Sequence, residues 1–341
     1  MLWDVIIAGA GIIGVSLAVE LRERGAKVLV FDSGEPGRES SSAAAGMLAP
    51  SDPETPGPLR LLAAESARLF PAFIRKLESL SEMPVDFRRH GSIAFVEESD
   101  VPDTYRKLSS SELQQLEPAL RTQSYPAFFV QEDSVDPELL MQAALAAAQH
   151  CGVAIRSNTA VEQMLSGGGQ VDVVAGGEHF TARAAVNCCG AWSGAPVKPR
   201  KGQMLYLQPQ RPALLTHVVR SPEVYLLPRS SGRVLVGATV EDVGYDKTVN
   251  PEAIENLHRN AANYVPDLGT AKVVASWAGL RPGTPDDLPI LGPTESPGIF
   301  IASGHFRNGI LLAPVTAQVM ADLIMGKEPH IEIVQFSVAR F

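Results

Sequence analysis

The chain has 341 residues, of which 45% are hydrophobic and 20% are charged, the balance of a globular protein with enough apolar material for a buried core. That composition excludes a disordered chain, a collagen-like repeat and a coiled-coil rod, and the length favours two domains. The formal net charge is −9. An acidic surface repels phosphate backbones and anionic lipid, so we expect neither a nucleic-acid nor a membrane partner.

The cysteines and the N-terminal stretch bear on the compartment. Cys151, Cys188 and Cys189 are an odd number without a C-x-x-C pair, which is typical of a reducing compartment and not of a disulfide scaffold or a zinc site. The N-terminus has no basic region, and the apolar run over residues 5–19 is too short to span a bilayer. The seven histidines show no metal-ligand spacing. We therefore expect a cytoplasmic protein without a metal site.

The first segment of the chain predicts a β-α-β unit. A β-branched run over residues 3–8 leads into the G-x-G-x-x-G sequence of residues 9–14, a helical pattern over 15–24 follows, and a second strand over 27–32 ends in Asp32. The glycines permit a tight turn, a pyrophosphate close to the backbone, and close helix–strand packing. The helix N-terminus offers free N–H groups to phosphates, and Asp32 is placed for ribose hydroxyls. This unit predicts a dinucleotide site, with NAD and FAD both open.

The rest of the chain mixes helical and strand patterns. After a small-residue segment over 40–50, helices are predicted at 59–80, 137–149, 251–264 and 311–325, and strands at 85–96, 128–131, 153–163, 171–174, 184–187, 203–207, 224–227, 234–238, 272–278 and 299–303. We therefore predict an α/β and α+β fold with two interleaved domains. Residues 1–82, 132–198 and 279–341 would form a Rossmann-like nucleotide domain, and residues 83–131 and 199–278 a β-sheet-rich substrate domain.

Several further segments occur in a fixed order. They are SAAAGML over residues 42–48, NCCGAWS over 187–193, WAGLRPG over 277–283, DLPILG over 287–292 and GHFRNGIL over 304–311. Together with the glycine turn they resemble the D-amino-acid-oxidase family of flavoproteins, and within it the glycine oxidases associated with thiamine biosynthesis. The resemblance covers residues 3–325 and implies FAD instead of NAD. No cysteine follows Cys189, whereas relatives with covalent flavin attach it near the last motif, so we expect non-covalent FAD.

The resemblance also implies roles for individual residues. Arg281 would hold the substrate carboxylate in a planar bidentate fork, assisted by Tyr225, and Arg307 would lie near both flavin and substrate. Some relatives carry methionine where this chain has Val240, which would widen the pocket and weaken selectivity for glycine alone. The predicted cofactor contacts are Gly9, Gly11, Ile12, Ile13, Gly14, Asp32, Ser33, Ser40, Ser41, Ala45, Gly46, Met47, Val161, Gly190, His305, Phe306, Arg307, Asn308, Gly309, Ile310 and Leu311.

The reaction that the resemblance implies is FAD-dependent oxidative deamination of glycine, and also of sarcosine and small D-amino acids. Hydride would pass from Cα to flavin N5 without a side-chain general base, O2 would be reduced to H2O2, and glyoxylate and ammonia would form. The resemblance further implies a role in thiamine thiazole formation and a homotetramer. Two alternatives remain open: a quinone-linked D-amino-acid dehydrogenase, and a flavin-binding module without turnover.

Overall fold

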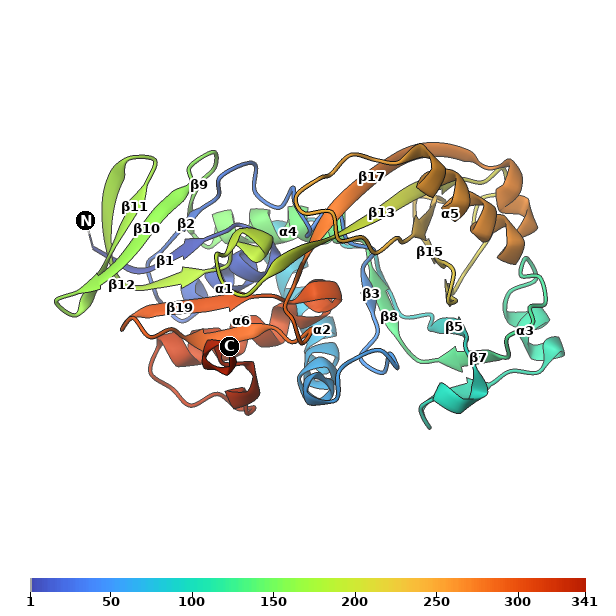
Figure 1. The fold of residues 1–341 in the computed structure, drawn as a ribbon, viewed down its shortest axis with the longest axis horizontal. Coiled ribbons are helices and arrows are strands. Elements are labelled where there is room, and N and C mark those ends of the chain that lie inside the picture. The colour runs from blue at the N-terminus through green and yellow to red at the C-terminus, as the bar shows by residue number, and fades with distance from the viewer. Residues whose placement is uncertain (1) are drawn as a thin grey trace.

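The computed structural model describes residues 2–341. Figure 1 shows two lobes side by side along the long axis, and both chain ends belong to the lobe that contains β1. The first lobe is built on an eight-stranded sheet in the order β10-β11-β12-β1-β2-β9, with β19 beside β12 and β18 beside β19. A second eight-stranded sheet, in the order β17-β13-β16-β15-β14-β5-β7-β6, forms the other lobe. The predicted mixture of a Rossmann-like unit with a sheet-rich part is confirmed.

The N-terminal unit folds as predicted. β1 (Leu2–Ala8) runs into α1 (Ile12–Glu23) and then β2 (Val28–Phe31), and β1 pairs in parallel with β2 and with β12 (Glu178–Asn187). A Cβ on Gly14 would lie 2.0 Å from the carbonyl oxygen of Gly9. Helix α1 therefore packs against the turn at a distance that only glycine permits.

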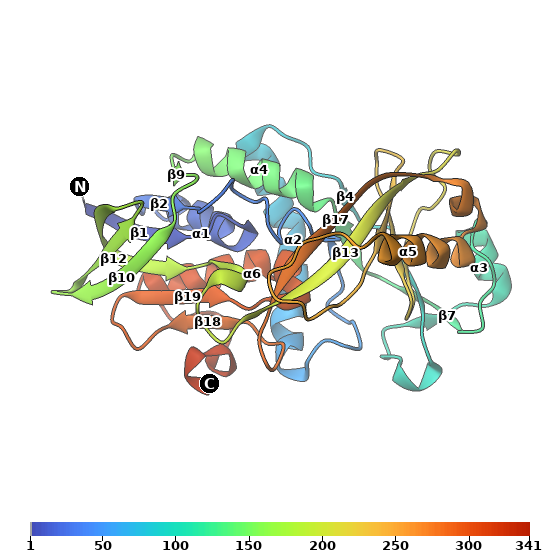
Figure 2. The ribbon, with the colours of Figure 1, turned by 45° about the horizontal axis from the view of Figure 1, so that its top comes forward.

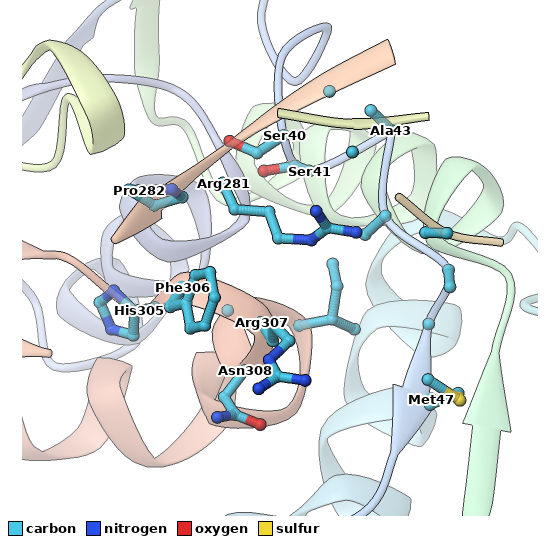
Figure 3. A pocket seen from close by; sticks show the side chains of 18 of the residues that line it. Ser40, Ser41, Ala43, Met47, Arg281, Pro282, His305, Phe306, Arg307 and Asn308 are labelled. Carbon is cyan, nitrogen blue, oxygen red and sulfur yellow. The ribbon is translucent and has the colours of Figure 1, made fainter. Parts of the chain in front are cut away.

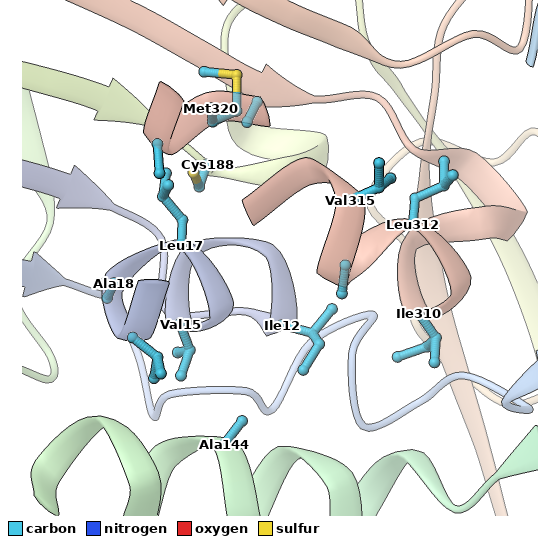
Figure 4. Packing of buried hydrophobic residues seen from close by; sticks show 14 of the residues in the cluster. Ile12, Val15, Leu17, Ala18, Ala144, Cys188, Ile310, Leu312, Val315 and Met320 are labelled. Carbon is cyan, nitrogen blue, oxygen red and sulfur yellow. The ribbon is translucent and has the colours of Figure 1, made fainter. Parts of the chain in front are cut away.

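The first sheet is completed by strands from distant parts of the chain and is covered by four helices. These are β9 (Ala154–Arg156), β10 (Val161–Gly167), β11 (Gln170–Ala175), β18 (Ile290–Pro293) and β19 (Ile299–Ser303), with α2 (Arg60–Ser81), α4 (Pro137–His150) and α6 (Gly309–Ile324) in addition to α1. Figure 4 shows Val15 on the side of α1 that faces Ala144 of α4, and Leu17 on the side that faces Met320 of α6. None of the helices within residues 2–341 combines the length and the apolar character of a bilayer span.

Two of the predicted strand ranges each contain two strands. Residues 85–96 hold strands at 87–88 and 92–95, which belong to different sheets. Residues 153–163 form two strands, β9 and β10, because the chain turns between them at Asn158, whose φ is 52°. The left-handed conformation is tolerated by asparagine better than by β-branched residues, and it ends the extended run. The strand over 299–303 and the helix over 251–264 have the predicted bounds.

Two helices pack against one face of the second sheet. Its strands are β5 (Ser92–Phe95), β6 (Arg106–Lys107), β7 (Ala127–Val130), β13 (Lys198–Gln208), β14 (Val218–Arg220), β15 (Tyr225–Pro228), β16 (Val234–Gly237) and β17 (Lys272–Gly283). Helix α5 (Pro251–Tyr264) lies along β13, as Figure 2 shows, and buries Ile254 and Leu257 against Leu205. A short helix that we did not predict, α3 (Ser110–Leu116), begins with a capping box between Ser109 and Glu112.

A small third sheet connects the lobes. It consists of β3 (Met47–Leu48), β8 (Asp133–Val135) and β4 (Phe87–Arg88), with β8 in the middle. Figure 1 shows β3 and β8 between the two larger sheets. The segment that leads into β3 therefore lies where the two lobes meet.

The other face of the second sheet presents a row of side chains from neighbouring strands. The strand register pairs Ala94 with Arg220, Arg220 with Tyr225, Tyr225 with Gly237, and Gly237 with Met204. Residues paired directly across a sheet point to the same face. This row forms one wall of the cavity described next.

Candidate active site

A cavity of about 930 Å³ lies between the two lobes, near the upper end of the range for small-molecule sites. Its walls are the N-terminal glycine turn, residues 31–56, the turn over 188–190, the row on the second sheet, and residues 305–310. Figure 3 shows Arg281 entering from one side, Arg307 and Asn308 from another, and Met47 opposite. The cavity thus joins the predicted nucleotide unit to the predicted substrate unit.

All but two of the predicted site residues line this cavity. The two exceptions are Gly14, which packs against Gly9, and Leu311, whose carbonyl accepts a hydrogen bond from the Ser66 hydroxyl at 2.6 Å. The residues that line it are Gly9, Gly11, Ile12, Ile13, Asp32, Ser33, Ser40, Ser41, Ala45, Gly46, Met47, Val161, Gly190, Tyr225, Arg281, His305, Phe306, Arg307, Asn308, Gly309 and Ile310. Gly14 and Leu311 therefore pack against other parts of the chain and do not line the cavity.

Asp32 holds the glycine turn in place. Its Oδ2 accepts a hydrogen bond from the Ala10 backbone N–H at 2.8 Å, and its Oδ1 accepts one from the Gly34 N–H at 2.9 Å. Each carboxylate oxygen can accept more than one hydrogen bond, so capacity remains for a ribose hydroxyl. Asp32 therefore shapes the turn and also faces the space beside it.

Ser41 lies directly over the N-terminus of α1. Its Oγ accepts a hydrogen bond from the Ile12 N–H at 2.9 Å, and the N-cap residue Gly11 has no side chain that could do so. The first turn of α1 contains no acidic residue. This end of the helix is therefore a favourable place for a phosphate, with Ser41 beside it.

Replacing Ser41 with alanine is expected to raise the dissociation constant for FAD by about tenfold, the effect of about one hydrogen bond to a charged group. Titration of the apoprotein with FAD, followed by flavin fluorescence, measures this. Ser79→Ala, on the far part of helix α2, is the matched control. An unchanged dissociation constant would contradict a phosphate contact for Ser41.

The segment before β3 is fixed by a buried arginine that we did not predict. The Arg229 guanidinium, 1% exposed, donates from Nη2 to the Ala45 carbonyl at 2.5 Å and from Nη1 to the Val135 carbonyl at 3.1 Å. Its Nε lies 3.6 Å from a carboxylate oxygen of Asp136. In the sequence, Arg229 follows a predicted strand. The one hint of its role there is that a charged residue stands next to apolar residues, which indicates a buried partner for the charge.

The segment over residues 304–310 places a second helix N-terminus at the cavity. Helix α6 begins at Gly309, its first turn has no acidic residue, and its N-cap residue Asn308 makes no side-chain capping bond. The backbone N–H groups of this turn are thus free for an acceptor, and the helix dipole favours negative charge there. Phe306 has a φ of 47°, which turns the chain sharply ahead of the helix.

His305 reaches the cavity from a buried position. Its Nε2 lies 3.2 Å from the Thr316 hydroxyl oxygen, and burial lowers the pKa of His305 to about 3. The imidazole is therefore neutral at physiological pH. Because the imidazole is hydrogen-bonded to Thr316 of α6, the His305 side chain fixes the start of that helix.

Stability should depend on pH through His305. Its folded-state pKa is below the ordinary value of 6.5, so the unfolded state binds the extra proton and the contribution of His305 is lost as the pH falls from about 6.5 toward 3. Urea unfolding should show wild type losing about 1 kcal/mol more than His305→Gln between pH 6.5 and 5.5. His90→Gln, at an exposed position, is the control. Parallel pH profiles for wild type and His305→Gln would contradict a buried neutral imidazole.

Arg281 presents a guanidinium without a carboxylate partner. It lies flat over Gly202, where a Cβ would come within 2.1 Å of Nη1, and Nη1 donates to the Thr239 carbonyl at 3.2 Å. Within residues 2–341 no Asp or Glu lies within ion-pair distance of it. A partly buried guanidinium without a counter-charge attracts a carboxylate from a ligand.

Tyr225 lies beside this guanidinium on the wall of the cavity. Its ring packs over Gly237, where a Cβ would lie 2.5 Å from the ring, and its hydroxyl lies 3.4 Å from Met204 Sδ. Burial raises the pKa of Tyr225 above its ordinary value, although the charge of Arg281 opposes this. The hydroxyl is therefore protonated and can donate a hydrogen bond.

Arg307 differs from Arg281 in being paired. It forms an ion pair with Glu54, and its guanidinium stacks over the Phe306 ring at 5.1 Å from the centroid. Its side chain is 44% exposed. Of the two arginines that we predicted near the substrate, the structure leaves Arg281 available for a carboxylate and engages Arg307 with a residue of the chain itself.

A second charged cluster on the cavity wall was not predicted. Arg220 contacts Asp52 at 2.7 Å, the Tyr105 hydroxyl at 2.6 Å and Glu132 at 3.1 Å. These four residues are far apart in the sequence, and only Arg220 lies on a strand of the second sheet, so the fold brings the other three to it. No local signal could have identified the cluster.

The dinucleotide turn, the two helix N-termini and the cavity shared with a second sheet define a nucleotide-dependent oxidoreductase of two lobes. A family model described as DAO, FAD dependent oxidoreductase, matches residues 4–323. This chain therefore belongs to the DAO family of FAD-dependent oxidoreductases, and FAD is its cofactor.

Similar proteins cover the whole chain. A glycine oxidase from Geobacillus kaustophilus is 36% identical over 99% of this chain and 97% of its own length. The crystal structure of glycine oxidase from Geobacillus kaustophilus matches with a TM-score of 0.95 at 32% identity, covering 100% of this chain and 99% of that one. A bifunctional protein ThiO/ThiG from a Nostoc species is 34% identical over 99% of this chain and 55% of its own length.

The residues present fit FAD. A Cβ on Gly9 would lie 2.4 Å from the Cys188 carbonyl oxygen, and a Cβ on Gly11 would lie 3.0 Å from Ser41 Oγ. The turn at the start of α1 is therefore packed so closely that these two positions admit only glycine, and its bare backbone would hold the pyrophosphate of FAD. The start of α6 also lines the cavity with N–H groups that no side chain caps, and these would serve as donors to acceptor atoms of FAD. Both helix N-termini thus offer donors to the cofactor.

Proposed function

We propose that this protein oxidises glycine to glyoxylate and ammonia. The balanced reaction is glycine, O2 and water giving glyoxylate, ammonia and H2O2. The observation that carries the proposal is the unpaired Arg281 guanidinium on the cavity, in a chain whose full-length relatives include glycine oxidases. When bound, FAD supplies the two-electron oxidant for the Cα–H bond and is regenerated by O2.

The residues of the chain bind and orient the amino acid. Arg281 takes the carboxylate in its planar fork, and the protonated Tyr225 hydroxyl donates a hydrogen bond to one carboxylate oxygen. Fixing the carboxylate at two points fixes the carboxylate plane and the position of Cα and leaves only rotation about the bond between them, which contributes to the rate gain from positioning. The side chains hold the substrate, and none is assigned as a general base.

Sarcosine and small D-amino acids belong to the same proposal. Val240 lines the cavity and is 60% exposed there. Its side chain is shorter than that of methionine, which supports space for a small substituent on the substrate. We expect turnover of sarcosine and D-alanine in addition to glycine.

The remaining features of the proposal rest on the resemblance described above. They are non-covalent FAD held by the predicted cofactor residues, a homotetramer, a cytoplasmic location and a role in thiamine thiazole formation. The two interleaved domains are also a proposal, supported by the two large sheets. The boundary at residue 279 falls within β17, which remains in the second sheet to Gly283.

Anaerobic mixing of the FAD-loaded protein with glycine tests the function. We expect bleaching of the visible flavin band and, on admission of air, its recovery with one H2O2 per glyoxylate. Bleaching without rapid recovery would indicate a dehydrogenase that uses another acceptor. An unchanged spectrum with glycine, sarcosine and D-alanine would remove the substrate assignment.

A further inference from the structure

The cavity carries a second arginine on the same wall as the substrate residues. Arg220 pairs with Tyr225 across β14 and β15, so the two side chains leave the same face of the sheet next to each other. Three strand-to-strand steps, about 14 Å in total, separate β14, which carries Arg220, from β13, where the Arg281 guanidinium lies over Gly202. Both Arg220 and Arg281 line the cavity. A ligand that is held at Arg281 and extends along this wall of the cavity approaches Arg220.

The charge of Arg220 is more than balanced by its neighbours. Nη1 lies 2.7 Å from Asp52 Oδ2, and Nη2 lies 3.1 Å from Glu132 Oε2. Two carboxylates thus surround one guanidinium, whose Nε has no hydrogen-bond partner among residues 2–341. Burial raises the pKa of Glu132, while the charge of Arg220 opposes that shift.

The two carboxylates have different positions. The Glu132 side chain is 2% exposed and does not line the cavity, so it stabilises the buried guanidinium from behind. The Asp52 side chain is 29% exposed, lines the cavity and contacts Nη1 of the guanidinium. Asp52 is therefore the carboxylate that a ligand would have to displace.

We infer that Asp52 blocks Arg220 as a second carboxylate anchor and makes the cavity selective against substrates and inhibitors that carry a second carboxylate. A dicarboxylate held at Arg281 would bring a third negative group to one guanidinium, and like charges at that distance repel. Glu97 and Glu223 line the cavity in the segments next to Ala94 and Arg220, and they add to the repulsion. The inference rests on the proposed function in taking Arg281 as the carboxylate anchor.

Binding of matched ligands to the FAD-loaded protein tests this without turnover. Isothermal titration calorimetry would compare succinate with succinamate and glutarate with glutaramate, because each pair differs in one charge at nearly constant shape. We expect wild type to bind the monoamides more tightly. Asp52→Asn should shift the affinity ratio toward the dicarboxylates by about 10- to 100-fold, the range for a hydrogen bond to a charged group.

Two controls distinguish the release of Arg220 from a general change of charge in the cavity. Glu97→Gln removes one negative charge from an exposed cavity residue without freeing Arg220. Its ratio of dicarboxylate affinity to monoamide affinity should therefore stay within about threefold of the wild-type ratio. The double variant Asp52→Asn with Arg220→Met should return to the wild-type ratio, because the freed guanidinium is then absent. FAD content and melting temperature of each variant show whether it is folded.

Three results would overturn the inference. The first is that wild type binds the dicarboxylates at least tenfold more tightly than the monoamides. The second is an unchanged affinity ratio in folded Asp52→Asn, and the third is a shift of that ratio in Glu97→Gln as large as in Asp52→Asn. The first needs no variant, so the test does not depend on the folding of Asp52→Asn. Bleaching by glycine is measured separately, and its presence together with any of these results would reject the inference while leaving the proposed function intact.

Discussion

Replacing Arg281 with alanine is expected to lower kcat/KM for glycine by about 10²- to 10³-fold while FAD remains bound. Hydrogen bonds to charged groups contribute about 1.5–3 kcal/mol each, and a bidentate pair would be lost together with its charge. The effect should appear mainly as a higher KM, because the carboxylate is held in both the ground state and the transition state. Arg281 lies outside the phosphate-binding turn, so FAD content should be unchanged.

Steady-state H2O2 production over a wide range of glycine concentrations measures this effect. Arg211→Ala is the matched control, because the Arg211 side chain is 77% exposed and its ion pair with Asp267 is long, at 3.8 Å. A companion variant, Gly202→Ala, keeps the arginine but places a methyl group within 2.1 Å of its guanidinium, and it should raise KM in the same direction. Equal KM values for wild type and Arg281→Ala would exclude Arg281 as the anchor.

The parts of the fold that the sequence predicted are those with strong local signals. The β-α-β unit follows from a β-branched run, fixed glycine spacing and an acidic strand end, all within one short segment. Helix α5 was predicted with its bounds because Asn250 caps it, Pro251 occupies its first turn and its apolar residues lie on one face. Where the signal was weak, as in the short helix α3 and the turn at Asn158, the prediction failed.

The candidate site also has parts that the sequence predicts and parts that it does not. The glycine turn, Asp32 and the start of α6 lie in short motifs that were visible in the sequence, and the structure brings them to one cavity. The contacts that hold them come from elsewhere: Arg229 reaches Ala45, and Arg220 collects Asp52 and Glu132. Such partners are 88 to 184 residues apart in the sequence and are brought together by the fold, and a single sequence contains no periodicity that reports them.

Gly14→Ala should cause the largest loss of FAD. The new Cβ would lie 2.0 Å from the Gly9 carbonyl oxygen and 3.3 Å from Ile7 Cγ2, and the first of these neighbours is backbone, which cannot rotate away. Helix α1 would have to move off the turn, and its N–H groups would no longer meet the phosphate together with the backbone of Gly11. We expect the free energy of unfolding to fall by about 3 kcal/mol and the purified protein to lose FAD on gel filtration.

The flavin-to-protein absorbance ratio after gel filtration, together with urea unfolding, measures both effects. Gly167→Ala is the matched control, because a Cβ there meets nothing within 4 Å and φ is not in the left-handed region. The two variants add the same methyl group, so a difference between them isolates the contact of α1 with the turn. Full FAD content in Gly14→Ala would show that the turn can relax around a side chain, and the phosphate site would then depend on Ser41 and Asp32 more than on the close approach of α1.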